Sequence, residues 1–127
     1  MLTEIKIGNR TYPLIFGIKF IREMDKRYQG KNEKAGLSYG FGLGMATVYI
    51  EQRNPVILMD LIQAATITEK TKPSVDEIEA FLEATDTNLE KLFKDFLLSL
   101  EKSPITQPMM KHMADAKQEE TNAKSEE

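Results

Sequence analysis

The stretch that decides the fold spans residues 89–100 and reads LEKLFKDFLLSL. Its apolar residues recur at steps of three and four, the period of one face of an α-helix. These positions are Leu89, Leu92, Phe93, Phe96, Leu97 and Leu100. A Glu90–Lys94 pair supports the charged face, and Ser103-Pro104 predicts where the helix ends. The sequence therefore predicts an amphipathic helix with one face packed on a core.

Two further helices are predicted just before this stretch. Ser74 and Glu77 have the spacing of a capping box, and an apolar stripe follows them. Asn54-Pro55 also predicts a helix start, because asparagine can cap free N–H groups and proline has no N–H to lose. Residues 56–65 carry only one charge, Asp60, so we expect this helix to be the buried centre of a small bundle.

The N-terminal residues show a different period. Residues 3–7 and 10–16 alternate between polar and apolar side chains around a Gly8-Asn9 turn. This pattern predicts a β-hairpin in which Ile5 faces Tyr12, and in which Ile5, Tyr12 and Leu14 are buried on one face. Pro13 cannot donate a backbone hydrogen bond, so we expect it to lie on an outer edge.

Residues 17–52 predict two helices joined by a loop. The first helix begins after Gly17, places basic side chains opposite its apolar face and should stop at Gly30. Residues 30–44 are rich in glycine and predict a mobile loop. A helical pattern resumes from Leu43 to Gln52.

The composition changes after Pro104, where aromatic residues are lacking and polar residues dominate. This composition is typical of disordered segments. The expected fold is mostly α with a small N-terminal β-hairpin (α+β). A compact domain at 1–103, made of the hairpin and the helices, would precede a flexible, disordered polar tail at 104–127.

Composition also excludes several classes of function. The chain has 127 residues, with 17 Lys and Arg against 20 Asp and Glu, and this net charge of −3 argues against nucleic-acid binding. The longest apolar runs are far shorter than the roughly 20 residues that cross a bilayer, and Met1 to Glu4 do not begin a secretory signal. Without cysteine, and with His112 as the one histidine, we expect no enzymatic activity, no cofactor and no metal site.

Two groups of residues are candidates for contact with a protein partner. Around the glycine-rich loop, the apolar candidates are Tyr39, Phe41, Leu43 and Met45. In the tail, Met109 and Met113 belong to a stripe with Ile105 and Ala116 that could fold against a partner, since methionine adapts well to different contacts. A loose tail with scattered methionines is an equally good interpretation.

The glycine series itself does not match a phosphate-binding loop. Gly40-Phe41-Gly42-Leu43-Gly44 lacks the Gly-Lys-Ser/Thr ending of a P-loop and the G-x-G-x-x-G spacing of a dinucleotide loop. A flexible connection explains it better. His112 among three methionines could in principle form a soft-metal site, but a stripe that contacts a partner, or a loose polar tail, explains these residues better.

The order of these features resembles the tail assembly chaperones of long, non-contractile-tailed phages and prophages. The resemblance covers about residues 3–103. It is carried by the spacing of six segments, at residues 4–12, 16–25, 40–44, 54–66, 73–79 and 89–96.

This resemblance implies a non-catalytic protein of the host bacterial cytoplasm that is absent from the mature virion. Such a chaperone binds the tape measure protein and keeps it soluble while the tail tube forms. In this family, a ribosomal frameshift typically gives a longer product that recruits the tail tube protein, and this sequence looks like the short form. Self-association is a further expectation, because an exposed hairpin edge can pair with another copy.

Two alternative functions remain open at the level of sequence. One is a structural phage tail or head–tail connector protein, which would stay in the particle. The other is a small regulatory DNA-binding protein, supported only by the basic helix face of Lys19, Arg22, Lys26 and Arg27.

Overall fold

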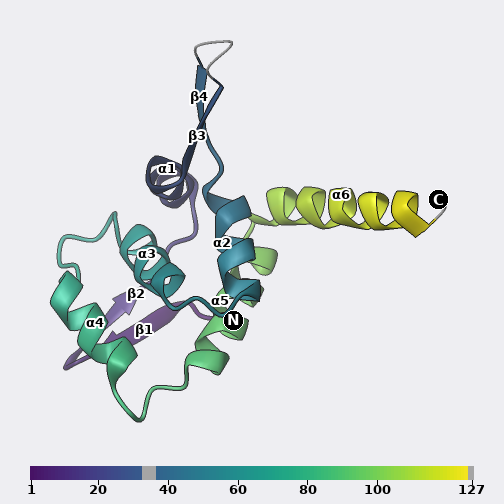
Figure 1. The fold of residues 1–127 in the computed structure, drawn as a ribbon. Helices are drawn as coiled ribbons and strands as arrows, with labels where there is room; N and C mark the ends of the chain where they lie inside the picture. Colours follow the sequence, from purple (N-terminus) through teal and green to yellow (C-terminus); the bar gives the residue numbers. More distant parts are fainter. Residues whose placement is uncertain (33–36, 126–127) are drawn as a thin grey trace.

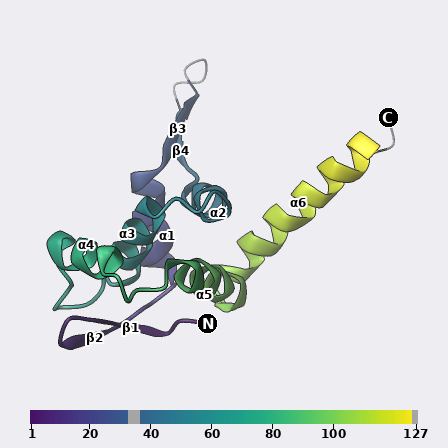
Figure 2. The same cartoon turned by 60° about the horizontal axis from the view of Figure 1, so that its bottom comes forward.

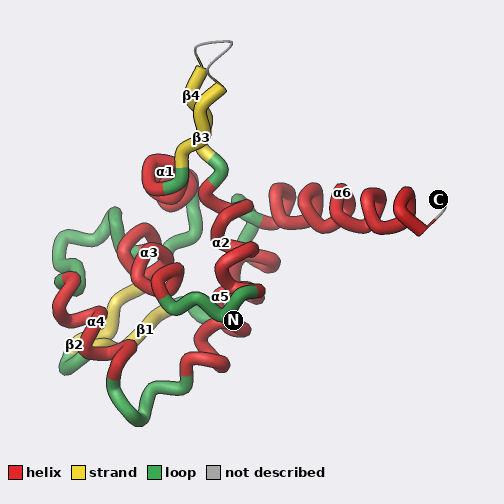
Figure 3. The backbone as a smooth tube through the Cα atoms, viewed as in Figure 1, coloured by secondary structure: helices red, strands yellow, loops and turns green. Residues whose placement is uncertain are grey.

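A computed structural model describes residues 1–32 and 37–125, with side chains described for 1–29 and 41–119. It contains two β-hairpins and six helices in the described residues (Figures 1 and 3). The strands are β1 (Glu4–Ile7), β2 (Arg10–Pro13), β3 (Gln29–Asn32) and β4 (Leu37–Gly40). The helices are α1 (Ile18–Arg27), α2 (Gly42–Glu51), α3 (Val56–Ala65), α4 (Val75–Glu83), α5 (Leu89–Lys102) and α6 (Gln107–Ser125). The expected fold class, mostly α with an N-terminal hairpin, is confirmed.

The first hairpin has the register that the alternation predicts. Ile5 pairs with Tyr12, and Ile7 with Arg10, across antiparallel strands β1 and β2. Ile5, Tyr12 and Leu14 are buried, while Pro13 is exposed. Gly8 adopts a φ of 64°, a left-handed conformation that glycine tolerates without steric cost.

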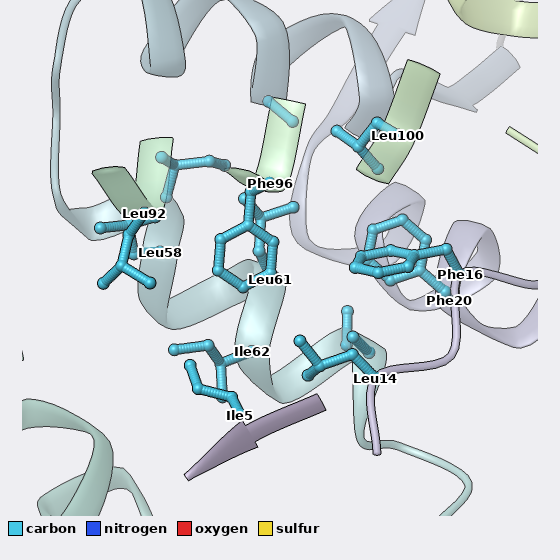
Figure 4. Close-up of a cluster of buried hydrophobic side chains, with 14 of the residues drawn as sticks. Ile5, Leu14, Phe16, Phe20, Leu58, Leu61, Ile62, Leu92, Phe96 and Leu100 are labelled. Atoms are coloured by element: carbon cyan, nitrogen blue, oxygen red, sulfur yellow. The ribbon is translucent and has the colours of Figure 1, made fainter. Parts of the chain in front are cut away.

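Helix α3 lies at the centre of the core, as its low charge predicts. Ile57, Leu58, Leu61 and Ile62 of α3 have no exposed surface. Phe96 of α5 is equally buried, and the Phe16 ring packs edge-on against Phe20 and Phe96, with centroids 5.1 Å and 6.2 Å away (Figure 4). The sheet face of β1 and the amphipathic face of α5 thus bury their apolar side chains against one central helix.

The capping box is confirmed in detail, and α3 begins at Val56, one residue later than Asn54-Pro55 predicts. Ser74 and Glu77 form a complete capping box at the start of α4. The Asn54 side chain accepts a hydrogen bond from the Val56 N–H at 3.0 Å. Glu90 forms its close ion pair with Arg53 at 2.9 Å, because the turn after α2 brings a guanidinium beside the start of α5. Lys94, the partner predicted from the sequence, contributes a weaker attraction that also lowers the pKa of Glu90.

The glycine-rich segment is not the loop that its composition predicts. Strands β3 and β4 form a second antiparallel hairpin, with Gln29 opposite Gly40. Helix α1 accordingly ends at Arg27, before Gly30. Residues 33–36 lie outside the described part. The hairpin projects from the helical body in two views 60° apart (Figures 1 and 2). The alternation of polar and apolar residues that identifies a half-buried strand in sequence is broken here by Gly30, Gly36 and Gly40.

Within the segment expected to be a polar tail, residues 107–125 form helix α6. Two buried residues attach its start to the body. The Thr106 hydroxyl donates to the Leu100 carbonyl oxygen at 2.6 Å, and Met110 is only 8% exposed. From Ala114 to Glu119 every side chain is exposed, and the helix extends away from the body (Figures 1 and 2). Because the rest of the segment is polar, its composition does not reveal that Thr106 and Met110 attach it to the body.

Candidate partner-binding surface

The first candidate surface is built on the start of helix α2, which is fixed against α1. Gly42 lies so close that a Cβ placed on it would be 2.5 Å from the backbone carbon of Met24. The Gly42 N–H donates to the Asp25 carboxylate at 2.8 Å, which supplies an acceptor and a negative charge at the N-terminus of α2. The Phe41 N–H donates to the Tyr28 carbonyl oxygen at 3.0 Å. The end of α1 thus holds both the base of the second hairpin and the first turn of α2.

A polar cluster fastens this junction to the central helix. The Tyr28 hydroxyl donates to the Asp60 carboxylate, and its ring packs edge-on against Tyr49 at 5.7 Å. Arg27 donates to the same carboxylate at 2.9 Å and to Gln63 at 2.7 Å. Burial, followed by the hydrogen bond to Asp60, raises the pKa of the Tyr28 hydroxyl, which stays protonated and keeps donating.

The candidates near the glycine series differ in accessibility. Phe41 is 37% exposed and Met45 is half-buried, whereas Leu43 is 1% exposed and belongs to the core. Tyr39 lies in β4, and its side chain is outside the described residues. Phe41 and Met45 are therefore the two of this group that the structure places with described, accessible surface.

The two candidates on α6 also differ in accessibility. Met109 is 41% exposed, while Met113 is half-buried and packs against the edge of the core. A Cβ placed on Gly44 would be 3.9 Å from the Met113 sulfur, an ordinary van der Waals contact. Met113 thus connects the two candidate groups, since Gly44 and Met45 belong to the same turn of α2.

Helices α2, α5 and α6 enclose a groove of about 680 Å³ at this connection. Its lining combines apolar side chains with exposed charged ones. The apolar lining residues are Val48, Leu97, Met110, Met113 and Ala114. The charged ones are Glu51, Glu101, Lys111 and Lys117, and the last of these pairs with Glu51 at 2.9 Å between α6 and α2.

Val48, Leu97 and Met110 are not among the contact residues predicted from the sequence. All three stand in apolar stripes of helical period, which is also the signature of core residues. Whether such a residue lines the core or a groove depends on the neighbouring helix. That neighbour is α6, in a segment whose composition predicts disorder.

The other sequence candidates do not assemble into a site. No group of three or more His, Asp or Glu side chains that could hold a metal ion lies within the described residues. On the basic face of α1, Arg27 is paired with Glu23 and Asp60, so part of the positive charge is neutralised within the protein.

Comparison with known families gives a match over residues 4–114, to the model of phage tail assembly chaperone proteins. The chain belongs to the phage tail assembly chaperone family. The match spans both hairpins, helices α1 to α5 and the first two turns of α6. No curated protein and no solved structure matches the chain.

Membership of the tail assembly chaperone family implies that the partners are tail proteins, and that family is typically non-enzymatic. The family match ends within α6, just after Met113. It thus includes both candidate groups and the methionines of the groove. Among the described residues, no helix has the length and apolar character needed to cross a membrane.

Proposed function

We propose that this chaperone binds the tape measure protein in the host cytoplasm, keeps it soluble during tail morphogenesis and is absent from the finished virion. The observation that carries the proposal is the family match over residues 4–114. A tape measure chain with long apolar helical stripes would otherwise associate through those stripes. Many chaperone copies along one client would together bind more tightly than one copy alone.

Phe41, Met45, Met109 and Met113 are the described candidates for client contact, and Tyr39 is retained from the sequence. Exposed or half-buried side chains support this choice for the described four. Methionine in particular adapts to varied apolar surfaces, as a protein with a long client requires. Leu43 would act from the core by fixing the position of its neighbours.

The resemblance extends the proposal to two products of one gene. The 127-residue chain would be the short form, and a longer frameshifted form would recruit the tail tube protein. Intact-mass analysis of chaperone purified from phage-producing cells tests this point. A single mass, with no longer product sharing these residues, would contradict it.

Co-expression with the phage's tape measure protein tests the main proposal. We expect the tape measure protein to stay soluble and to co-purify with many copies of the chaperone. Equal insolubility with and without the chaperone would refute the proposal. Mass spectrometry of purified virions separates a chaperone, which is absent, from a structural tail or connector protein, which is present.

Single substitutions test the contact residues. Phe41→Ala and Met45→Ala should each lower the amount of soluble client, while Val56→Ala serves as the control. Val56 is 57% exposed at the start of α3, a helix that contributes no residue to either candidate group. Unchanged client recovery with folded Phe41→Ala and Met45→Ala variants would remove these residues from the contact surface.

A further inference from the structure

Two exposed helix faces of this chain carry opposite charges at the same spacing. The basic stripe on α1 consists of three exposed residues at steps of three and four: Lys19, Arg22 and Lys26. The acidic stripe on α4 consists of three exposed residues at the same steps: Asp76, Glu79 and Glu83. With 3.6 residues per turn, each stripe covers an arc of about 60° on its helix. Each helix therefore presents charge of one sign to solvent.

An exposed aliphatic residue stands at the start of each stripe. Ile18, the first residue of α1, is 59% exposed, and Val75, the first residue of α4, is 48% exposed. Each lies four residues before the middle charge of its stripe, and residues at this spacing share a helix face. The two faces thus have one pattern, an aliphatic residue followed by three charges, with the sign of the charges reversed.

The charges of both stripes are available to another molecule. Among the side chains that the structure describes, no ion pair involves Lys19, Arg22 or any residue of the acidic stripe. The Lys26 ammonium group lies 4.0 Å from the Glu23 carboxylate, but the Lys26 side chain is 74% exposed. This long contact leaves most of the Lys26 side chain accessible.

The two acidic residues of α1 interact elsewhere and do not cancel the basic stripe. Glu23 accepts a hydrogen bond from Arg27 at 3.3 Å, and Asp25 accepts one from the Gly42 N–H at 2.8 Å. Both acidic residues are half-buried. Their negative charge is therefore used mainly within the chain.

The basic and acidic stripes do not meet within one copy. Helix α3 packs against both α1 and α4 and lies between them in two views (Figures 1 and 2). The stripes face solvent, so the opposite charges that would complement them belong to another molecule. A second copy of this chain carries the complement of each stripe at the matching spacing.

We propose that α1 of one copy packs against α4 of another copy, with the two helices parallel. Three pairs of opposite charge then face each other: Lys19 with Asp76, Arg22 with Glu79, and Lys26 with Glu83. In this direction Ile18 also covers Val75. An antiparallel arrangement would pair the charges but leave the two aliphatic residues at opposite ends of the contact in water, so burial of the aliphatic pair selects the parallel direction.

This contact goes beyond the proposed function, because it requires no client. It joins unlike faces, so a single contact leaves a basic stripe on one copy and an acidic stripe on the other for further copies. Exposed ion pairs contribute little individually and are screened by salt, so free copies should associate weakly, and more weakly as salt is added. Copies held side by side on one client would associate more strongly, since their effective concentration is higher.

Charge exchange tests the contact on the full-length chain without client. Arg22→Glu and Glu79→Arg should each weaken self-association about tenfold, because each places like charges against each other. An equimolar mixture of the two variants should recover association to within about threefold of wild type, since each variant supplies the charge that the other lacks. Lys94→Glu changes an exposed residue of α5 outside both stripes and should have no effect. Sedimentation velocity at low salt measures all four.

Three results would overturn the contact, and each leaves the proposed function standing. The first is a wild-type chain that stays monomeric at low salt up to about 1 mM. The second is self-association that neither folded variant changes, which would assign it to another surface. The third is loss of association in both variants without recovery in their mixture, because α1 and α4 would then not face each other.

Disulfide formation tests the direction of the helices, because the chain contains no cysteine. With a mild oxidant, Ile18→Cys should link to Val75→Cys about fivefold faster than to Glu83→Cys, since a disulfide requires closely spaced Cβ atoms. Val56→Cys, at a residue 57% exposed on α3, is the control partner and should link slowly. Intact mass identifies each mixed dimer. Faster linkage to Glu83→Cys would overturn the parallel arrangement, and equal linkage to all three partners would overturn the contact.

Discussion

The two β-hairpins of this chaperone are antiparallel strand pairs of equal length, yet different interactions hold them. The β1–β2 hairpin buries Ile5, Ile7 and Tyr12 in the core. The β3–β4 hairpin projects from the body and is attached at its base, where Phe41 donates to Tyr28 (Figure 1). A hairpin can thus belong to the core through its side chains or be positioned by a junction at its end. Substitutions should separate these two modes.

The largest effect is expected from the first hairpin. Ile7 is 2% exposed, so Ile7→Ala should lower the free energy of unfolding by about 2–5 kcal/mol through lost burial and a residual cavity. Lys6→Ala on the exposed face of the same strand should change it by less than about 0.5 kcal/mol. Denaturant unfolding measures both. Similar small changes for the two variants would show that this hairpin is not part of the core.

The next effect concerns the junction that holds the second hairpin. Gly42→Ala forces a Cβ onto the Met24 backbone and should cost about 1–3 kcal/mol. Gly44→Ala in the same helix has room for a methyl group, and should be neutral or stabilising by up to about 1 kcal/mol. The difference in thermal stability between the two variants measures the effect of the close contact between α1 and α2. That contact would be disproved by equal stability of the two variants.

A smaller and more local effect is expected at Tyr28. Tyr28→Phe removes the hydrogen bond to Asp60, which keeps its ion pair with Arg27, so the cost should be about 1 kcal/mol. Amide exchange should become faster at Phe41 and stay unchanged at Ile5. Tyr28→Leu should have a larger effect because it also removes the ring contact with Tyr49. Faster exchange in both hairpins would argue that they unfold as one unit.

The smallest effect is a pH dependence at helix α4, which packs beside the first hairpin. Hydrogen bonds from the backbone and side chain of Ser74 lower the pKa of Glu77, and the positive charge of Arg10 on β2 lowers it further. Because the folded pKa lies below the unfolded value, this contribution to stability is present above the unfolded pKa and is lost as the pH falls through the folded pKa. An NMR titration should show the Glu77 pKa rising part of the way toward its usual value in Ser74→Ala, because alanine keeps the backbone N–H that donates to Glu77. An unchanged pKa would exclude the Ser74 hydroxyl as one of its causes.

The sequence predicts well the parts of the fold in which periodicity and burial coincide. The register of β1–β2, the buried helix α3 and the capping box of α4 are examples. It fails for the second hairpin, whose strands β3 and β4 pair in a segment rich in glycine, and for α6, which is attached by Thr106 and Met110 within a polar segment. The same holds for the candidate surface. The sequence identifies Met113 as an apolar residue in a polar tail, but it does not predict that Met113 lies beside Gly44.

The sequence by itself determined the α-rich core, the first hairpin and the family resemblance. The spacing of apolar residues specifies which faces of the helices and strands are buried. The tertiary structure alone decided that Leu43 lies inside, that Glu90 pairs with Arg53 and that α2, α5 and α6 enclose a groove. These outcomes depend on which element becomes the neighbour of each face. That choice follows from packing between segments far apart in the chain, and no local period records it.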